Sequence, residues 1–313
     1  MNEYKPEGVL IRTQKNYEYI CSYAGLEAAM AEGAILEAIA TLCDHRMNLH
    51  LELGAGMRAV IPREEAVLVA DGEQIKDIAI LTRVGKPVCF KVIGFERSAA
   101  GERTAILSRR AAQLECRECY ISTLEPGDII PTKITHLESF GAFVDIGCGI
   151  TSLLSIDCIS VSRIAHPSAR LGEGDMIYTV VKTVDDRGRI YVSERELLGS
   201  WEENASLFSE GETVKGIIRS VESYGVFVEL MPNLAGLAEY RDDVRVGQTA
   251  AVYIKSIIPE KMKIKLIIID MNDAPSTPGR LEYFIDTDSV THMDYWIYSP
   301  KGCKKVVETL FGT

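Results

Sequence analysis

Apolar and polar residues alternate along much of the chain with the period of two that is expected of half-buried β-strands. The segments GDIIPTKITHLE and GETVKGIIRSVE both alternate in this way, and each begins with a glycine. Each is followed by a second apolar strand, a Leu-rich segment, another Gly-led strand and a last strand after a polar turn. Five short strands in this order predict one closed antiparallel barrel for each copy.

The second strand of each copy carries nearly the same motif. HLESFGAFVDIG covers 136–147 and SVESYGVFVELM covers 220–231. The distance along the chain between these two motifs is too long for one unit of a solenoid, and it suits a small barrel domain that is repeated whole. A fainter copy begins at Gly33 and continues through RAVIPREE, VGKPVCFKVIGFE and RTAILSRR, with Met47 and His50 at its aromatic positions.

The segments between the copies have apolar residues at helical spacing, so we expect helices there. In SERELLGSWEENASLFSEG one apolar stripe consists of Leu197, Leu198, Trp201, Ala205 and Phe208. Ser193 and Glu196 fit a capping box, and Gly211 fits a helix stop. SRRAAQLECRECYIS and YEYICSYAGLEAAMAEG predict weaker helices before the second and first copies. The last stretch opens with a Pro/Ser/Gly linker and then predicts two strands and a helix over 306–311.

Two aromatic residues in each motif are the candidate binding groups. Strict strand alternation would place Phe140 and Phe143 on opposite faces, so we expect Gly141 to form a bulge or bend that turns both rings the same way. Two exposed rings on one barrel face can stack unpaired bases, at roughly 1–3 kcal/mol for each base. The alternative is that one ring of each pair belongs to the core.

The pattern aromatic-Gly-Ala-Phe-Val-Asp, then Ser-Leu-Leu, then Val-Asp-Asp-Arg-Gly-Arg-Ile-Tyr-Val-Ser resembles the S-one RNA-binding domain, the OB-fold repeat of the ribosomal protein S-one family. The resemblance covers roughly residues 30–270. It implies a mostly β fold of three tandem five-stranded OB-fold barrels joined by α-helices, with a small C-terminal α+β segment. The predicted segments are an N-terminal helical extension (1–29), a degenerate first repeat (30–110), a linker helix (111–124), a second repeat (125–195), a linker helix (196–209), a third repeat (210–271) and a C-terminal strand-strand-helix segment (272–313).

The resemblance also implies the residues that would contact RNA. In the family these are the two motif aromatics, a His after the Leu-rich segment, and an Asp and an Arg in the last turn. The corresponding residues of the second copy are Phe140, Phe143, Ser155 in place of the His, Asp185 and Arg189. Those of the third copy are Tyr224, Phe227, Glu239 in place of the His, Pro259 in place of the Asp and Lys263 in place of the Arg. We expect the second barrel to bind best, the third more weakly and the first least. Without the resemblance, Arg189 would be interpreted as a solvated turn residue.

Charge and composition limit the classes of protein to which this chain can belong. The net charge of −11 opposes a simple basic surface for nucleic acid, although a local groove can coexist with an acidic remainder. No secretory start and no stretch of about 18 apolar residues is present, so we expect a cytosolic, cytoplasmic protein that does not span a membrane. The eight cysteines do not suggest a disulfide scaffold.

Other candidate chemistry is weak. Cys116 and Cys119 form one isolated CxxC pair, and His45 and His50 lie near Asp44, but in both cases a metal or redox role is less favoured than ordinary thiols and surface histidines. The adjacent acids at 185–186 and 242–243 are interpreted as solvated turns. The C-terminal aromatics Tyr283, Phe284, Tyr295, Trp296 and Tyr298 either extend an RNA platform or, more often for such a cluster, form a local core. We therefore predict no cofactor, no metal and no enzymatic activity.

The first hypothesis is a binding protein that holds single-stranded RNA or mRNA during translation, with the small ribosomal subunit as a further candidate partner. The second is an acidic protein-interaction scaffold whose barrels have lost RNA binding. The third is an accessory subunit that delivers RNA to a nuclease.

Overall fold

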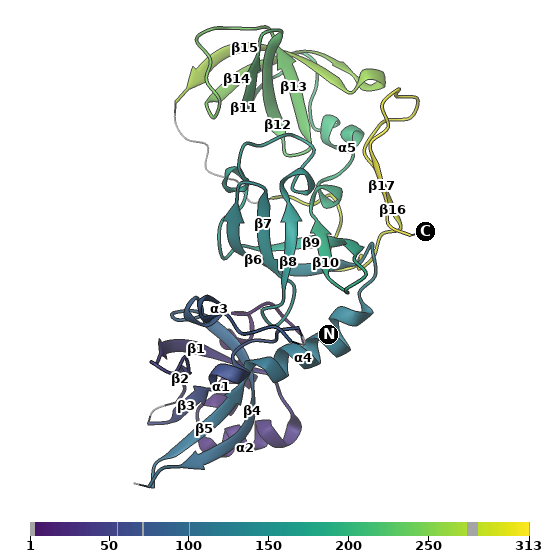
Figure 1. Cartoon of the computed structure of the whole chain (residues 1–313). Coiled ribbons are helices and arrows are strands. Elements are labelled where there is room, and N and C mark those ends of the chain that lie inside the picture. The colour runs from purple at the N-terminus through teal and green to yellow at the C-terminus, as the bar shows by residue number, and fades with distance from the viewer. Residues whose placement is uncertain (1–3, 55, 71, 100, 274–280, 313) are drawn as a thin grey trace. The chain divides into compact units, whose positions relative to one another are not determined.

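The computed structural model describes residues 4–54, 56–70, 72–99, 101–273 and 281–312. These residues form two compact units (Figure 1). Unit 1 comprises Met1–Leu124 and Asp145–Thr151, and unit 2 comprises Glu125–Val144 and Ser152–Thr313. The predicted Pro/Ser/Gly linker falls on residues 274–280, outside the described residues. The division into seven segments stays a prediction.

Unit 1 contains a closed five-stranded barrel with the neighbour order β1-β2-β3-β5-β4. Its strands are β1 (Leu36–Cys43), β2 (Leu49–Glu52), β3 (Arg58–Ile61), β4 (Pro87–Arg97) and β5 (Arg103–Ser108). Alternate residues of these strands fill a core that includes Leu36, Leu49, Phe90 and Leu107. The apolar half of each strand pattern therefore faces the barrel interior.

Helices cover this barrel, and their ends follow from the local sequence. They are α1 (Gln14–Ile20), α2 (Tyr23–Glu32), α3 (Asp77–Leu81) and α4 (Arg109–Cys119). Thr13, Ser22 and Ser108 cap α1, α2 and α4, because each side chain accepts a backbone N–H of the first turn. Gly33 ends α2 in the left-handed conformation at φ 68°. Both α2 and α4 pack on β4.

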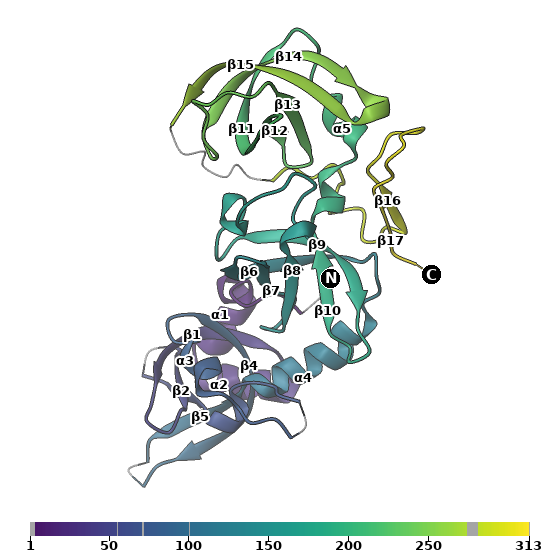
Figure 2. The same cartoon turned by 45° about the horizontal axis from the view of Figure 1, so that its top comes forward.

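Unit 2 contains two further closed barrels, whose strands are labelled in Figures 1 and 2. The second barrel is built from β6 (Ile129–Glu138), β7 (Gly141–Asp145), β8 (Thr151–Ser155), β9 (Met176–Val184) and β10 (Ile190–Ser193). The third is built from β11 (Thr213–Glu222), β12 (Gly225–Met231), β13 (Leu234–Ala238), β14 (Thr249–Ile258) and β15 (Lys263–Asn272). The turn between β7 and β8 belongs to unit 1.

All three barrels have the same strand order, so the predicted five-stranded OB-fold barrels are present as a mostly β architecture. They are not wholly antiparallel, which corrects the expectation from the strand pattern. The third and fifth strands of each barrel, β3 with β5, β8 with β10 and β13 with β15, pair in parallel. In each barrel the fifth strand lies between the third and the fourth, and the fourth strand pairs with the first to complete the ring.

The connection between the second and third barrels is less helical than predicted. The 3₁₀ turn Arg195–Leu198 is followed by Gly199, whose φ of 78° interrupts the helix, and α5 (Trp201–Ala205) is only 5 residues long. The capping box lies at Ser200 and Glu203 and not at Ser193 and Glu196. The other 3₁₀ turns are Leu10–Arg12, Arg63–Glu65, Ile121–Thr123, Ile156–Cys158, Pro167–Ala169 and Pro259–Lys261.

The predicted C-terminal helix over 306–311 is wrong. This part of the chain forms β17 (Glu308–Leu310), which pairs antiparallel with β16 (Tyr295–Ile297). β-branched residues at 306, 307 and 309 favour an extended chain over a helix, and the partner strand supplies hydrogen bonds. Trp296 and Tyr298 are buried in the same core as the third barrel.

Polar contacts fix the second and third barrels and the C-terminal segment to one another within unit 2. Asn233 accepts the Val161 N–H at 2.9 Å and donates to the Arg195 carbonyl at 2.8 Å. Its own carbonyl accepts the Tyr298 hydroxyl at 2.5 Å. Among the described residues, no helix is long and apolar enough to cross a membrane.

Candidate nucleic-acid interface

The two motif aromatics of the second barrel lie side by side on its outer surface. Phe140 occupies the turn between β6 and β7, and Phe143 occupies β7. The Phe140 side chain is 52% exposed, Phe143 is half-buried, and the ring centroids are 6.0 Å apart at an interplanar angle of 87°. Both rings therefore face the same way, as expected. The reason differs from the predicted strand bulge, because the first ring lies in the turn before the strand begins.

Gly141 is required at this place by a close approach of two strands. A Cβ atom at position 141 would lie 2.4 Å from the Leu154 carbonyl oxygen and 2.9 Å from the Ser155 Cα. The Phe140 carbonyl, one residue earlier, accepts the Ile156 N–H at 2.9 Å. Glycine thus allows β8 to pack against the turn that holds Phe140.

The third barrel repeats this arrangement. Tyr224 is 68% exposed in the turn before β12, and Phe227 is half-buried in β12. Their ring centroids are 6.1 Å apart at 88°. A Cβ at Gly225 would lie 2.6 Å from the Ala238 carbonyl oxygen, which matches the contact at Gly141. The repeated motif therefore builds the same two-ring platform twice.

Asp185 organises the turn between β9 and β10. Its Oδ1 accepts the N–H groups of Arg187 at 2.9 Å and Arg189 at 2.8 Å, and its Oδ2 accepts the Arg189 Nε–H at 2.7 Å. The Arg189 backbone N–H, followed by other hydrogen bonds of the turn, holds the pKa of Asp185 below its usual value. The Arg189 side chain is 63% exposed, so its remaining N–H groups face solvent. Asp185 thus holds the Arg189 guanidinium in position.

Ser155 ends β8 beside Gly141. Its hydroxyl donates to the Asp157 carboxylate at 2.6 Å, and this hydrogen bond lowers the pKa of Asp157. Ser155 therefore lies at the edge of the platform but is engaged with an acid.

The substituted positions of the third barrel are all at the surface. Glu239 is exposed directly after β13, Pro259 begins the 3₁₀ turn between β14 and β15, and Lys263 is the exposed first residue of β15. No Asp–Arg pair like that of 185 and 189 is therefore built into this turn.

Strand register defines a row of outward side chains across each barrel. In the third barrel, Phe227 lies opposite Leu237, which in turn lies opposite Lys265.

The other two barrels have the corresponding row. In the second barrel, Leu153 lies opposite Tyr191, and the shared Gly141 and Gly225 contacts place Phe143 next to Leu153. In the first barrel, the row consists of His50, Val60 and Ile106. His50 thus occupies the position of Phe227, as the sequence alignment of the repeats predicts.

Sequence reasoning missed Tyr191, the third member of the row in the second barrel. It is half-buried on β10, two residues after Arg189, and its proximity contributes to the raised pKa of Arg189, after the larger effect of Asp185. An outward aromatic residue in an alternating strand is the only signal for it in the sequence, and the partner strand is needed to place it on this face.

The first barrel offers a different surface. Met47 lies in the turn before β2 at φ 63°, and His50 Nε2 lies 3.2 Å from Asp44 Oδ2. Backbone N–H groups, with that of Asn48 first, hold the pKa of Asp44 well below its usual range. Asp44 therefore orders the turn between β1 and β2, as Asp185 orders the turn between β9 and β10. Among the described residues, no cluster of three or more His, Cys, Asp or Glu that could hold a metal ion is found.

The remaining candidate chemistry is structural. Cys116 is fully buried and Cys119 is exposed. Tyr283 donates to Glu194 at 3.1 Å, Phe284 packs against Gly199, and Trp296 and Tyr298 are buried. The C-terminal aromatics therefore form a local core, apart from Tyr295, which is 62% exposed.

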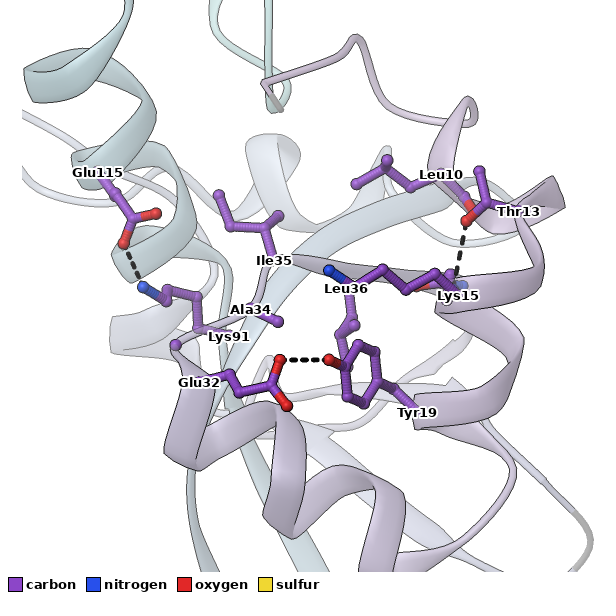
Figure 3. Close-up of a pocket in the computed structure, with 12 residues that line it drawn as sticks. Leu10, Thr13, Lys15, Tyr19, Glu32, Ala34, Ile35, Leu36, Lys91 and Glu115 are labelled. Atoms are coloured by element: carbon purple, nitrogen blue, oxygen red, sulfur yellow. Dashed lines mark hydrogen bonds and ion pairs between the residues drawn. The ribbon is translucent and has the colours of Figure 1, made fainter. Parts of the chain in front are cut away.

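Unit 1 also has a cleft of about 500 Å³ next to α1 and α2 (Figure 3). Most of its polar groups are hydrogen-bonded or ion-paired, and the Lys15 ammonium lies over the Tyr19 ring at 5.9 Å. Lys91 pairs with Glu115, Tyr19 donates to Glu32, and the Thr13 hydroxyl donates to the Leu10 carbonyl. These polar groups already have partners within the cleft, so the aromatic faces are the better candidate site.

Comparison with known proteins agrees with this geometry. Residues 123–195 match the family model described as S1 RNA binding domain, which is the family that the motif pattern indicates. The small ribosomal subunit protein bS1 homolog of Bacillus subtilis is 30% identical over 234 residues, which cover 71% of this chain and 56% of the relative. The bS1 homolog of Bacillus cereus is 29% identical over 267 residues, covering 81% of this chain and 65% of the relative. The small ribosomal subunit protein bS1 of Staphylococcus saprophyticus is 26% identical over 311 residues, covering 94% and 74%.

The chain therefore resembles ribosomal protein S1, and it spans 56% and 65% of the length of the two Bacillus relatives.

Proposed function

We propose that this protein binds single-stranded RNA, with the outer face of the second barrel as its principal site. Phe140 and Phe143 stack two bases, and Arg189, held by Asp185, contacts a phosphate or stacks on a third base. Tyr224 and Phe227 form a second platform on the third barrel. Binding is non-enzymatic and depends little on base sequence, because every base has a face that can stack.

The observation that carries this proposal is the exposed, repeated ring pair. An aromatic ring that serves the core is covered by its neighbours, whereas Phe140 and Tyr224 leave more than half of their surface in water at equivalent turns. The S1 RNA binding domain match over 123–195 coincides with the barrel that has the fuller set of polar partners. The face of the second and third strands is also where OB-folds bind oligonucleotides.

The finer organisation is part of the same proposal. Each barrel is one OB-fold domain, and the two barrels of unit 2 act together on one strand, so that the second contact forms at a high effective concentration. We also propose that the RNA is mRNA and that the small ribosomal subunit is a partner. The names of the bS1 relatives, which are small ribosomal subunit proteins, support the second of these. The net charge of −11 favours the alternative of a protein-interaction scaffold, and delivery of RNA to a nuclease remains the third hypothesis.

The test is a titration of a fluorescent single-stranded oligoribonucleotide with the whole chain at two salt concentrations. The Phe140→Ala/Phe143→Ala variant should lose most of the affinity. Tyr295→Ala removes an exposed ring from the C-terminal hairpin and serves as the matched control, with unchanged affinity expected. If the parent protein does not bind RNA, or if the double variant binds as well as the parent, the proposal is wrong and the scaffold hypothesis takes its place.

A further inference from the structure

The fourth strand of every barrel contains a bulge at the same place. In each case one extra residue interrupts the pairing with the fifth strand, next to the last member of the outward row. The extra residues are Ile93 in β4, Lys182 in β9 and Lys255 in β14. Bulges of this kind redirect a side chain, and Ile93 and Lys255 are exposed, so the bulge adds an outward side chain next to the last member of the row.

The three barrels fill the last two positions of the row with different chemistry. The first barrel has Ile93 and Ile106, which offer no charge. The second has Lys182 and Tyr191, but the Lys182 ammonium contacts the Cys158 sulfur at 3.0 Å and lies near Asp157. The third has Lys255 and Lys265, and both are exposed.

Lys255 and Lys265 are available for an anion. Within the part of the chain that the structure describes, neither ammonium forms an ion pair with an acidic side chain. The nearby acid Glu210 accepts the Ile257 N–H at 2.7 Å, so its carboxylate is engaged by the backbone. Lys265 lies one strand beyond Leu237, and Leu237 lies opposite Phe227. The two lysines therefore continue the surface that begins at the aromatic pair.

We infer that Lys255 and Lys265 form a phosphate-binding subsite for the RNA strand that leaves the Tyr224 and Phe227 platform. This inference rests on the proposed RNA-binding function. The subsite replaces the Asp–Arg turn that the third barrel lacks, so this barrel holds RNA mainly through backbone phosphates. The second barrel, with Tyr191 at the equivalent position, relies more on stacking.

The experiment measures how RNA affinity depends on salt. Each phosphate contact with a single strand contributes a slope of about 0.7 to the plot of log K against log salt concentration. The Lys255→Gln/Lys265→Gln variant should therefore reduce the slope by about 1.4. Both residues are exposed on strand surfaces, so a urea titration should show unchanged unfolding. The same pair of substitutions in the Phe140→Ala/Phe143→Ala background tests the third barrel with the second platform removed.

The matched control is Lys304→Gln/Lys305→Gln, which removes the same charge from exposed residues near the C-terminal strands. This control should leave the slope nearly unchanged. If the parent binds RNA and both double variants change the slope equally, the effect is one of net charge and the subsite is excluded. An unchanged slope in Lys255→Gln/Lys265→Gln has the same consequence. If the parent itself does not bind RNA, the proposed function fails first and the subsite fails with it.

Discussion

The Arg170 guanidinium donates two hydrogen bonds to the Glu229 carboxylate, from Nη1 at 2.9 Å and from Nη2 at 2.6 Å. Arg170 follows a 3₁₀ turn of the second barrel, and Glu229 lies in β12 of the third, so this pair joins the two barrels inside unit 2. Both side chains are almost fully buried. Arg219 adds two further hydrogen bonds to the same carboxylate. A buried carboxylate with two guanidinium partners is costly to disturb.

We predict that Glu229→Ala destabilises unit 2 by about 3–5 kcal/mol, because two buried guanidinium groups lose their counter-charge. Arg170→Ala should cost less, since Glu229 keeps Arg219. Both tryptophans of the chain, Trp201 and Trp296, are buried in unit 2, so their fluorescence in a urea titration reports this unfolding. Asp243→Ala, which removes the acid of an exposed pair with Arg241, should change stability by only about 0–1 kcal/mol. Equal effects of Glu229→Ala and Asp243→Ala would contradict the prediction.

Gly141 provides a second prediction. Gly141→Ala places a Cβ 2.4 Å from the Leu154 carbonyl oxygen, so the turn and β8 must separate. We expect a loss of stability of about 1–3 kcal/mol, as for other overpacked sites, together with weaker RNA binding because Phe140 shifts. Gly312→Ala is the control within the same unit, since a Cβ there meets open space. Tryptophan fluorescence in urea and an RNA titration measure the two effects. An unaffected Gly141→Ala protein would show that the strands can separate without cost.

Phe140 and Phe143 should respond differently when they are replaced one at a time. Phe140 is exposed in a turn, so Phe140→Ala should lower RNA binding by about 1–3 kcal/mol without changing the free energy of unfolding. Phe143 is half-buried in β7, so Phe143→Ala should lower both. Oligoribonucleotide titrations and urea unfolding of the two variants separate these outcomes. A loss of stability in Phe140→Ala equal to that in Phe143→Ala would place both rings in the core.

Much of the fold follows from local sequence. The strand alternation, the glycines and the repeated motif predict the five-stranded barrels, and the alignment of the faint first copy places His50 correctly in the row. These features depend on neighbouring residues in the chain. The C-terminal strands were predicted in part only, because the choice between helix and strand over 306–311 depended on a partner strand that the sequence does not identify.

The candidate site was predicted less completely for a related reason. The aromatic pairs and Asp185 with Arg189 belong to short motifs, and the structure brings each pair together. Tyr191 and Lys265 join the face only through strand register, and Lys182 and Lys255 only through a bulge. A slip of one residue reverses the face on which a side chain lies, so no pattern within one strand could have selected them.

The motif acid has a role that the sequence did not reveal. Asp145 and Glu229 occupy the same motif position, two residues after the half-buried ring, and both are buried. Asp145 accepts the Glu7 N–H at 2.7 Å within unit 1, whereas Glu229 holds Arg170 within unit 2. Burial raises the pKa of Asp145 to about 7. The motif therefore combines a surface for binding with an anchor for a neighbouring segment.

Glu194 gives the protein a predicted pH dependence. The side chain is fully buried and accepts the Tyr283 hydroxyl at 3.1 Å on Oε1, while Oε2 has no hydrogen-bond partner among the described residues. Burial, opposed mainly by the hydrogen bond from Tyr283 and by the charge of Arg170, raises the pKa of Glu194 from 4.5 to about 8. The folded protein therefore keeps this proton over a pH range in which the unfolded chain has released it.

Because the folded state binds the proton more tightly, the stability contributed by Glu194 is fully present below pH 4.5 and is lost as the pH rises through about 8. Glu194→Gln cannot ionise, so its free energy of unfolding should fall less than that of the parent between pH 5 and pH 9. We expect a difference on the order of a few kcal/mol, measured by urea titration with tryptophan fluorescence. Glu222→Gln, at an exposed position, should follow the parent at both pH values. If the parent and Glu194→Gln lose stability in parallel, the Glu194 carboxyl is already ionised in the folded protein near neutral pH, and the Tyr283 contact is made to a charged group.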